Sequence, residues 1–532
     1  MSTASAAPRR RARLVPMAMV AALVAAVLPV SAASAAPSSR LCETRNNQSP
    51  AKLLECMTVE GVFEHLEAFQ AIADANGGVR AEQTPGFDAS AHYVLEVLTE
   101  AGWDAEVVPF DYEAADAAIE QHTPAAASYE TGGFTGTGEG SVTGEVIPID
   151  VNLDGDRSNT SGCEPEDFAA VDLTGADDIV LLQRGTCFFS EKAVNAEAAG
   201  AEAVVLFNQG DGPSREGLIA ANASGLPDGS PSNLTIPVVG ASFADGAALA
   251  AGGVTATVSL DFVTLTSSNV IAELPGRVAD NVVVVGAHLD SVAAGPGIQD
   301  NAAAAATLLE LAQIMANNRP HNTIRLAWWG AEEIGLVGST AWVNDRSAEE
   351  LDEIALYLNL DIIASPNFIF SVYDAGESSF PATAPVPAGS AAIEDLFERY
   401  YTWQGVPYDD AGFSGRSDHQ PFVDAGIAAG GVFTGAEAVK TDEQVAIWGG
   451  VAGEQFDPCY HRACDTIDNV STEALAVNAD AVAYAVLHFS YSTSEVNGVR
   501  GRKMVGRPDL PEPDGSQLTF VGRTDGASPP IG

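Results

Sequence analysis

Basic residues are scarce in this sequence. Its 532 residues include 25 Lys plus Arg against 72 Asp plus Glu, which gives a formal net charge of −47. The first 36 residues hold a basic stretch at 9–13 and no acidic residue, so the rest of the chain is even more negative. A surface this negative repels phosphate backbones and anionic lipid, and the composition therefore excludes a nucleic-acid-binding protein.

Charged and aromatic residues are few, at 18% and 7%, whereas apolar residues make up 46% of the chain. A disordered acidic chain is poor in apolar residues, so we expect a folded protein. The chain is too long for one simple hydrophobic core, which predicts two or three folding units.

Long apolar runs are absent from the sequence after its N-terminal segment. Residues 14–30 are apolar, follow the basic stretch at 9–13, and precede the small residues at 34–36. This order is typical of a secretory signal peptide. Pro16 and Pro29 and the short apolar core argue against a permanent membrane anchor. We therefore expect a signal peptide at 1–36 and a secreted, extracellular protein without a membrane anchor after processing; the general and twin-arginine export routes both stay open.

Cysteine is also rare, with six residues in the chain. An even number of cysteines in an exported chain suggests disulfides. Proximity along the chain favours one of several possible pairings: Cys42–Cys56, Cys163–Cys187 and Cys459–Cys464. Zinc-thiolate sites are the alternative, but none of the spacings is the two-residue spacing that such sites favour.

Apolar runs alternate with amphipathic ones over much of the chain. Helices are expected at 59–75, 88–101, 190–199, 301–316, 335–345, 391–403 and 471–489. Strands are expected at 105–110, 145–149, 178–183, 203–207, 236–239, 281–287, 323–329, 354–360 and 427–433. Strands alternating with helices predict an α/β fold with a largely parallel, mixed sheet covered by helices.

The composition changes twice along the chain. Gly, Thr and Ser become frequent from about 125 to 264, which indicates a separate α/β module inserted into the main domain. Gly and Pro dominate again after 496, and we expect a loose tail there. The predicted organisation is a signal peptide at 1–36, a first part of the main domain at 37–124, an insert at 125–264, the rest of the main domain at 265–495, and a tail at 496–532.

Acidic and imidazole side chains follow three of the predicted strands. His288 ends the first strand, Glu332 and Glu333 follow the second, and Asp361 follows the third. Ligands of open α/β sheets collect beyond the carboxyl ends of the strands. Asp300, at the start of the helix predicted at 301–316, and His461, further along the chain, complete the set.

Each of these residues also has an ordinary structural interpretation. Asp300 could cap a helix, His288 could be a buried histidine, and the two glutamates could be a solvated pair. Asp361 is harder to explain in this way, because burying an unpaired carboxylate is costly. Four carboxylates converging in one cleft would repel each other, and two divalent cations would remove that repulsion. Mixed nitrogen and oxygen ligands favour zinc.

Two metal ions about 3.5–4 Å apart would activate a shared water and polarise a scissile carbonyl group. A carboxylate outside the metal ligands must then accept the proton of the water and pass it to the leaving amine. Adjacent residues of an extended segment point in opposite directions, so one of Glu332 and Glu333 can bind a metal while the other faces the water.

The ordered set of motifs resembles the secreted di-zinc aminopeptidases, the bacterial leucyl-type enzymes whose wider family includes yeast vacuolar aminopeptidase Y and glutamate carboxypeptidase. The resemblance covers about 80–123 and 265–490. It is carried by residues 84–90, 288–291, 300–301, 330–335, 359–361, 414–419 and 459–461.

The resemblance implies two Zn²⁺ per chain, with roles as follows: Asp300 bridging both ions, His288 and Asp361 completing one site, and Glu333 and His461 completing the other. It also implies that Glu332 is the general base and then the general acid, and that Tyr460 donates to the developing oxyanion. Asp290 is expected to orient the imidazole of His288.

Two further residues are candidate substrate contacts. Arg416 is expected to hold a carbonyl or carboxylate of the substrate, with a structural salt bridge as the equal alternative. Phe433 lies on the strand predicted beside an apolar pocket for the substrate side chain.

The insert resembles a protease-associated domain, through residues 178–189, 192–193 and 199–201. Nothing in it supplies catalytic chemistry, and a lid is its simplest role. One departure from the di-zinc family is the alanine run at 302–306, where Gly and Ser are common. Alanine would add strain if the backbone there needed a positive φ.

The sequence therefore predicts a secreted, monomeric metallo-aminopeptidase that removes large apolar residues from the N-termini of peptides or proteins. A carboxypeptidase of the same superfamily is the first alternative, but it would need a cationic pocket. A one-zinc cyclising acyltransferase and a binding protein that has lost catalysis are the others; the complete ligand set argues against both.

Overall fold

The structure is a computed structural model that describes residues 39–518 apart from 213–214, 228–229 and 383. The predicted signal peptide lies outside the described residues. Among the helices that are described, none combines the length and the apolar character needed to cross a membrane.

The chain begins with helices α1 (Ser39–Thr44), α2 (Pro50–Leu54), α3 (Val59–Ala75) and α4 (Pro85–Ala101). Helix α3 has the predicted bounds. Helix α4 starts three residues before the prediction, because the Thr84 side chain accepts a hydrogen bond from the N–H of Phe87 and Pro85 fits the first turn. It ends at Gly102, whose φ of 89° lies in the left-handed region.

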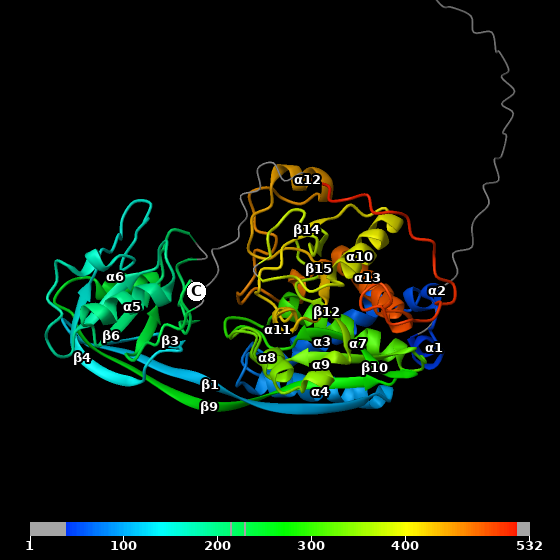
Figure 1. The fold of residues 1–532 in the computed structure, drawn as a ribbon, viewed down its shortest axis with the longest axis horizontal. Coiled ribbons are helices and arrows are strands. Elements are labelled where there is room, and N and C mark those ends of the chain that lie inside the picture. Colours follow the sequence, from blue (N-terminus) through cyan, green and yellow to red (C-terminus); the bar gives the residue numbers. More distant parts are fainter. Residues whose placement is uncertain (1–38, 213–214, 228–229, 383, 519–532) are drawn as a thin grey trace, which may run out of the picture. The chain divides into compact units, whose positions relative to one another are not determined.

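Two long antiparallel strands follow the edge of the main domain and continue into the insert (Figure 1). They are β1 (Asp104–Thr123) and β9 (Thr255–Leu274), each of 20 residues. Strand β9 pairs with β11 in the main domain and with β4 in the insert. The prediction of a strand at 105–110 was correct in place but too short.

The main domain contains a mixed sheet in the order β14-β13-β15-β12-β10-β11-β9. Its strands are β10 (Val278–His288), β11 (Asn322–Trp329), β12 (Ile354–Leu360), β13 (Ser371–Tyr373), β14 (Asp409–Ala411) and β15 (Ala429–Phe433). The central pairs β10–β11, β10–β12 and β12–β15 are parallel. This confirms the predicted largely parallel sheet.

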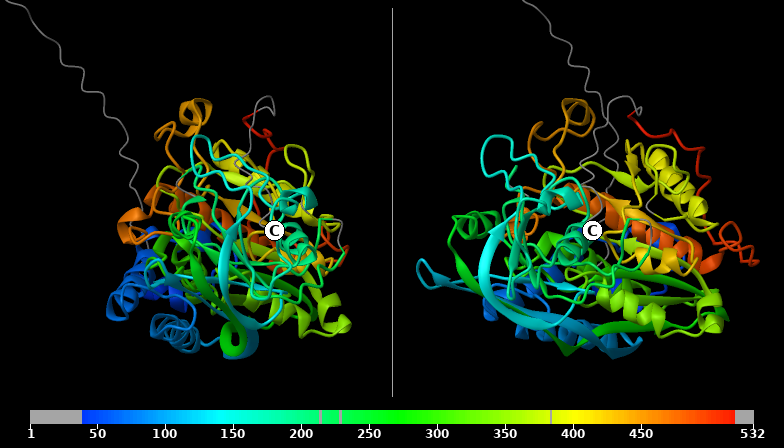
Figure 2. Two further views of the ribbon diagram at one scale, coloured as in Figure 1. Left: turned by 90° about the vertical axis from the view of Figure 1, so that its left-hand side faces the viewer. Right: turned by 60° about the vertical axis from the view of Figure 1, so that its left-hand side comes forward.

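Helices cover both faces of this sheet (Figure 2). The helices of the second part of the main domain are α7 (Ala303–Met315), α8 (Val337–Asn344), α9 (Ala348–Asp352), α10 (Ser390–Gln404), α11 (Gln420–Asp424), α12 (Asp442–Trp448) and α13 (Thr472–Tyr491). One core contains side chains of α3, α4, α7, α10 and α13. A second core lies on the other face, where Trp329, Trp342 and Phe422 pack together. The predicted helices agree with these within a few residues.

The insert has its own sheet and its own cores. Strands β4 (Gly140–Pro148), β5 (Ile179–Gln183), β6 (Ala203–Phe207) and β8 (Val238–Ala241) are parallel neighbours. The short strands β2 (Ala127–Tyr129), β3 (Gly132–Thr135) and β7 (Ala221–Asn222) extend the sheet region. Helices α5 (Phe189–Ala199) and α6 (Phe243–Leu249) pack on it, and apolar clusters lie on both faces. The insert is thus an α/β module, as predicted.

Three disulfides join Cys42 to Cys56, Cys163 to Cys187, and Cys459 to Cys464. These are the pairs that proximity favoured, and no cysteine is free.

The segment after α13 differs from the expected loose tail over its described part. The N–H of Gly515 donates to the hydroxyl of Tyr408, and the N–H of Gln517 donates to the Tyr408 carbonyl. Glu512 forms a salt bridge with Arg399 of α10 at 2.9 Å. Residues up to 518 therefore pack on the main domain.

Candidate active site

The parallel strands deliver the predicted side chains to one edge of the main sheet. His288 is the last residue of β10 and lies opposite Trp329, the last residue of β11. Glu332 and Glu333 follow Trp329 after a turn in which Ala331 has a φ of 57°. Asp361 follows β12, which is the other neighbour of β10. Because neighbouring parallel strands end at the same edge, these side chains meet there.

Asp300 lies at the centre of the group. Its Oδ1 is 3.3 Å from Nε2 of His288, and its Oδ2 is 3.3 Å from Nε2 of His461. Asp300 is not a helix cap, because α7 starts after Ala302 and Asp300 has non-helical φ and ψ of −112° and 91°. Its two carboxylate oxygens thus face two different imidazoles, which is the arrangement a bridging ligand requires.

The remaining ligand candidates complete two groups around Asp300. On one side, Nε2 of His288 is 3.4 Å from Oδ1 of Asp361 and 3.8 Å from Oε2 of Glu332. On the other side, Nε2 of His461 is 3.0 Å from Oε2 of Glu333. All five predicted metal ligands and Glu332 therefore converge, although they come from separate parts of the chain.

The donor set fits metal ions better than it fits a protein interior without them. Oε1 of Glu333 and Oδ1 of Asp361 are buried and have no hydrogen-bond partner among the described residues. Leaving buried carboxylate oxygens unsatisfied is costly, whereas a cation satisfies them. The ligand atoms of His288, Glu332 and Asp361 lie within 4.8 Å of one another, as do those of His288, Asp300 and Glu333. Both groups can hold a divalent ion.

Burial and charge shift the pKa values in this cluster. Burial, with Asp300 as the next cause, raises the pKa of Glu333 to about 7. Burial also raises the pKa of Glu332 well above its usual range, aided by Asp361 and Glu333. For His461, burial acts in the opposite direction, but Glu333 and Asp300 raise its pKa to about 10. Bound cations would take the place of these protons.

The loops that carry the ligands are held by buried acidic groups. Oδ1 of Asp290 accepts a hydrogen bond from the N–H of Glu332 at 3.1 Å, and Oδ2 accepts one from the N–H of Glu333 at 3.2 Å. The prediction that Asp290 orients His288 is met through its backbone: Nδ1 of His288 is 3.2 Å from the Asp290 carbonyl oxygen and 3.7 Å from its Oδ1.

Sequence reasoning missed two supporting residues. Oδ1 of Asp465 accepts from the N–H of Gln299 at 2.9 Å, and Oδ2 accepts from the N–H of Asp300 at 3.0 Å. The Ser417 hydroxyl donates to Oδ2 of Asp361 at 2.6 Å. An acidic residue four positions after His461 and a serine inside the motif at 414–419 were the available signals for these two roles.

Tyr460 and Arg416 lie beside the ligand group. The ring of Tyr460 stacks on that of His461 with the centroids 3.8 Å apart. Arg416 donates to Oε1 of Glu437 at 2.6 Å and to the hydroxyl of Tyr460 at 3.3 Å. Arg416 therefore forms a salt bridge with Glu437, which was the alternative to its predicted substrate contact. Phe433 ends β15 one residue after Val432, which pairs with Leu360 before Asp361.

The alanine run at 302–306 causes no strain. Ala302 and Ala303 both have a φ of −62°. All five alanines are fully buried, and their small side chains let α7 pack close to the sheet.

Comparisons with known proteins agree with this arrangement. Residues 269–486 match the model of Peptidase family M28, and residues 142–249 match that of the PA domain. The chain is 40% identical over 487 residues to an aminopeptidase of Pseudomonas aeruginosa, with 88% of each chain covered. It is 37% identical over 468 residues to a probable lipoprotein aminopeptidase of Mycobacterium tuberculosis, which covers 85% of this chain and 90% of the relative.

Two solved structures share the fold. One is a zinc aminopeptidase from Bacillus subtilis, with a TM-score of 0.63, 25% identity, and coverage of 81% of this chain and 95% of that chain. The other is an aminopeptidase from Aneurinibacillus sp. strain AM-1, with a TM-score of 0.58, 26% identity, and coverage of 87% and 100%. With a relative 40% identical over 88% of its length, the chain belongs to peptidase family M28, and it carries a PA domain.

Proposed function

We propose that the chain is an exported aminopeptidase that binds two zinc ions and removes large apolar residues from the N-termini of peptides. The observation that carries this proposal is Asp300, whose two carboxylate oxygens each face a different imidazole at 3.3 Å. A carboxylate in this position joins two cations into one centre. The aminopeptidases among its relatives support the reaction class.

In the proposed centre, His288 and Asp361 would hold one zinc ion, Glu333 and His461 would hold the other, and Asp300 would be shared between them. When bound, the two ions supply an activated water and polarise the scissile carbonyl group. Glu332 contacts the first group but is further from His288 than Asp361 is, at 3.8 Å against 3.4 Å. That separation favours Glu332 as the base rather than a ligand.

Glu332 accepts a proton from the attacking water and delivers it to the amine that leaves. Burial raises the pKa of Glu332, and a raised carboxyl pKa makes both proton transfers easier near neutral pH. Its side chain is 8% exposed, so bulk water competes little for that proton.

Tyr460 and Arg416 act together on the substrate carbonyl. Arg416 donates to the Tyr460 oxygen, so the hydroxyl proton of Tyr460 stays free to donate elsewhere. Directed at the carbonyl oxygen of the scissile bond, it would stabilise the charge that develops there. In this proposal Arg416 positions Tyr460, and Glu437 holds Arg416.

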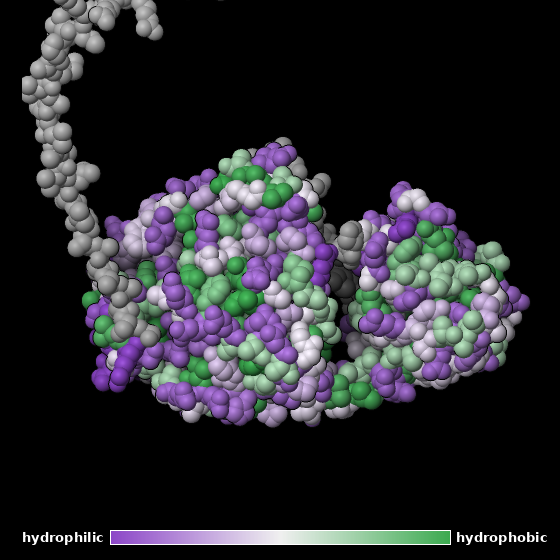
Figure 3. Space-filling view, turned by 180° about the vertical axis from the view of Figure 1, so that it is seen from behind, coloured by the Kyte–Doolittle hydropathy of each residue, from purple (hydrophilic) through white to green (hydrophobic). Residues whose placement is uncertain are grey.

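The substrate preference rests on the apolar end of β15, where Phe433 lies beside the site. Export rests on the N-terminal segment and on three disulfides, which persist in oxidising compartments. We also propose a monomer; on the face in Figure 3, hydrophilic residues are interspersed among hydrophobic ones. We also propose the domain limits 37–124 and 265–495 for the peptidase and 125–264 for the insert, and a tail at 496–532.

A carboxypeptidase would need a cation for the substrate carboxylate. Arg416 is the nearest candidate, and Glu437 already pairs with it. This pairing favours an aminopeptidase.

The test is hydrolysis of leucine 4-nitroanilide by the full chain. Activity should disappear with a chelator, return with Zn²⁺, and reach its maximum at two zinc ions per chain. Glu332→Gln should bind the same zinc and lose activity, whereas Glu349→Gln, an exposed control, should keep both. Full activity in Glu332→Gln, or cleavage of N-acetylated but not free-amine peptides, would overturn the proposal.

A further inference from the structure

A cluster of basic side chains follows α13. It consists of Arg500, Arg502, Lys503 and Arg507, and no acidic residue occurs between Val496 and Pro508. The whole chain has 25 basic residues against 72 acidic ones, so such a concentration of positive charge in one short segment is unusual for it.

This basic cluster lies at the edge of the sheet opposite to the metal ligands. The side-chain amide of Asn322, the first residue of β11, donates to the Phe489 carbonyl at 2.7 Å. The N–H of His321 donates to the Ser490 carbonyl at 2.9 Å. The C-terminal end of α13 is thus fixed at the amino ends of the strands, whereas the metal ligands lie at the carboxyl ends. A ligand bound at the cluster would therefore be separate from the substrate.

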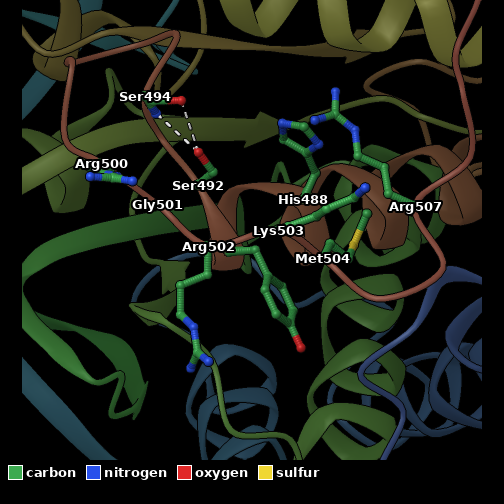
Figure 4. A pocket seen from close by; sticks show the side chains of 10 residues that line it. His488, Ser492, Ser494, Arg500, Gly501, Arg502, Lys503, Met504 and Arg507 are labelled. Atoms are coloured by element: carbon green, nitrogen blue, oxygen red, sulfur yellow. Dashed lines mark hydrogen bonds between the residues drawn. The ribbon is translucent and has the colours of Figure 1, made fainter.

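The segment folds back on α13 and lines a half-open pocket of about 320 Å³. The cavity lining consists of His488, Tyr491, Ser492, Ser494, Arg500, Gly501, Arg502, Lys503, Met504 and Arg507. In Figure 4, Lys503 and Arg507 extend on the side of His488, whereas Arg500 and Arg502 point away from it. Cavities of this size accommodate small ligands.

The four cations lack acidic partners. No carboxylate in the described part of the chain forms a salt bridge with any of them, although Arg399, in the neighbouring helix α10, pairs with both Asp395 and Glu512. In so acidic a protein, cations that only needed neutralisation would be expected to pair in the same way.

The need to pair the carbonyl groups at the C-terminal end of α13 does not explain the cluster either. Basic side chains often serve the unpaired carbonyls at a helix C-terminus. Here those carbonyls have other partners: His321 N–H serves Ser490, and the backbone N–H of Arg502 serves Tyr491. The charged end of Lys503 remains available to a ligand, whereas Arg507 also interacts with the side chains of Tyr484 and His488.

His488 provides a neutral polar group on the same cavity wall. It is 6% exposed, and its ring contacts those of Tyr484 and Phe489. Burial, with Arg507 as the second cause, lowers its pKa to about 3. The ring is therefore neutral and offers one N–H donor. The hydroxyls of Ser492 and Ser494 hydrogen-bond each other at 3.0 Å, so one of their two hydroxyl protons is left as a further donor.

We propose that this cavity binds a phosphate-type oxyanion. Lys503 and Arg507 supply the charge, and His488 and one hydroxyl of the Ser492–Ser494 pair supply neutral donors, a combination that matches an anion with several acceptor oxygens. A free phosphate is favoured over a membrane surface as the ligand, because the net charge of −47 repels anionic lipid. Phosphate carried on a lipid headgroup is the second source of the same chemistry.

The experiment titrates inorganic phosphate into the zinc-loaded full chain by calorimetry at low salt. Lys503→Gln/Arg507→Gln should weaken binding by about tenfold or more, since each charged hydrogen bond contributes a factor of that order. The control Arg277→Gln/Arg319→Gln removes the same charge from exposed positions and should bind as the wild type does. Zinc content and circular dichroism should be unchanged in both variants, which separates this result from misfolding.

Phosphate bound at the metal centre instead would be unaffected by Lys503→Gln/Arg507→Gln, and equal affinity in that variant would overturn the proposal. An equal loss of phosphate affinity in both double variants would show that only the net charge matters. That result would also overturn the proposal. Sedimentation with phosphatidylglycerol vesicles distinguishes the source: binding to vesicles that Lys503→Gln/Arg507→Gln abolishes would assign the phosphate to a lipid. Binding in neither assay would refute the site.

Discussion

The carboxylate of Asp465 accepts the backbone N–H of Asp300 at 3.0 Å and that of the preceding residue, Gln299, at 2.9 Å. Asp465 lies four residues after His461. It directly follows Cys464, whose disulfide with Cys459 closes the His461 loop. One carboxylate thus connects the loop of the bridging ligand to the loop of a second ligand. The side-chain amide of Asn469 donates to Asp465 and to Asp457, which keeps both acids in place.

Replacing Asp465 should therefore weaken metal binding rather than remove a ligand. In Asp465→Asn, one of the two oxygens that accept a backbone N–H is replaced by an NH₂ group. This group cannot accept and would face the N–H of Gln299 or Asp300. We expect zinc affinity to fall by about 10–100-fold, the usual effect of losing a group that orients a ligand. Competition with a chromogenic chelator measures this directly, and excess zinc should restore much of the activity.

Asp468→Asn is the matched control, because Asp468 lies in the same segment but is exposed. It should retain wild-type zinc affinity. Unchanged affinity in Asp465→Asn would mean that the Asp300 loop holds its shape without this contact.

The strands and ligands of the main domain were predictable because their physical signals are local. Strand β12 is buried at every residue and is apolar apart from Asn359, so Asp361 stands out at its end. His288 is the last residue of β10 and stands out in the same way after the buried run 282–287. Parallel strands must end at one edge, so the ligand set follows from order alone.

Contacts that depend on tertiary structure were not predictable. Most of β1 is exposed or half-buried, so its 20 residues carry no strong apolar pattern, and it is long because β9 pairs with it throughout. Asp465 resembles any polar loop residue until Gln299 and Asp300 come close. Tyr408 similarly fixes the last described residues, whose Gly- and Pro-rich sequence is typical of a loose tail.

The disulfide between Cys459 and Cys464 closes a short loop that contains Tyr460 and His461. Opening it should free both side chains and reduce the affinity of the Glu333–His461 zinc site. We expect Cys459→Ser/Cys464→Ser to retain one zinc ion more tightly than the second and to lose activity. Metal analysis after dialysis against a weak chelator measures the two affinities.

Cys163→Ser/Cys187→Ser is the control for that experiment, since this disulfide lies in the insert. It should lower the stability of the insert and leave zinc stoichiometry unchanged. Loss of zinc in both variants would point to general unfolding.

The buried alanine run should not tolerate larger side chains. Ala305 is fully buried, and its carbonyl accepts a hydrogen bond from the indole N–H of Trp328 at 3.0 Å. Ala305→Val should lower the free energy of unfolding by about 1–3 kcal/mol through overpacking. Urea denaturation measures this change. Ala279→Val, at an exposed position of β10, should change stability little, and equal effects of the two variants would argue against tight packing around α7.

His419 should make the fold sensitive to acid. It is fully buried between Tyr373 and Phe413, and burial lowers its pKa to about 3. In the unfolded chain the same imidazole titrates near its ordinary value of 6.5, so below that pH the unfolded state binds the proton more readily. The contribution of His419 to stability is therefore present above pH 6.5 and is lost progressively as the pH falls toward 3. Each pH unit in this window contributes up to about 1.4 kcal/mol.

His419→Phe removes the titrating group, so its free energy of unfolding should fall less steeply between pH 6 and 4 than that of the wild type. Urea denaturation across this range measures the slopes, and His92→Gln, whose side chain is 71% exposed, should retain the wild-type slope. Equal slopes in His419→Phe and the wild type would show that His419 takes up its proton in the folded state, which would require a partner for the ring that its surroundings do not provide.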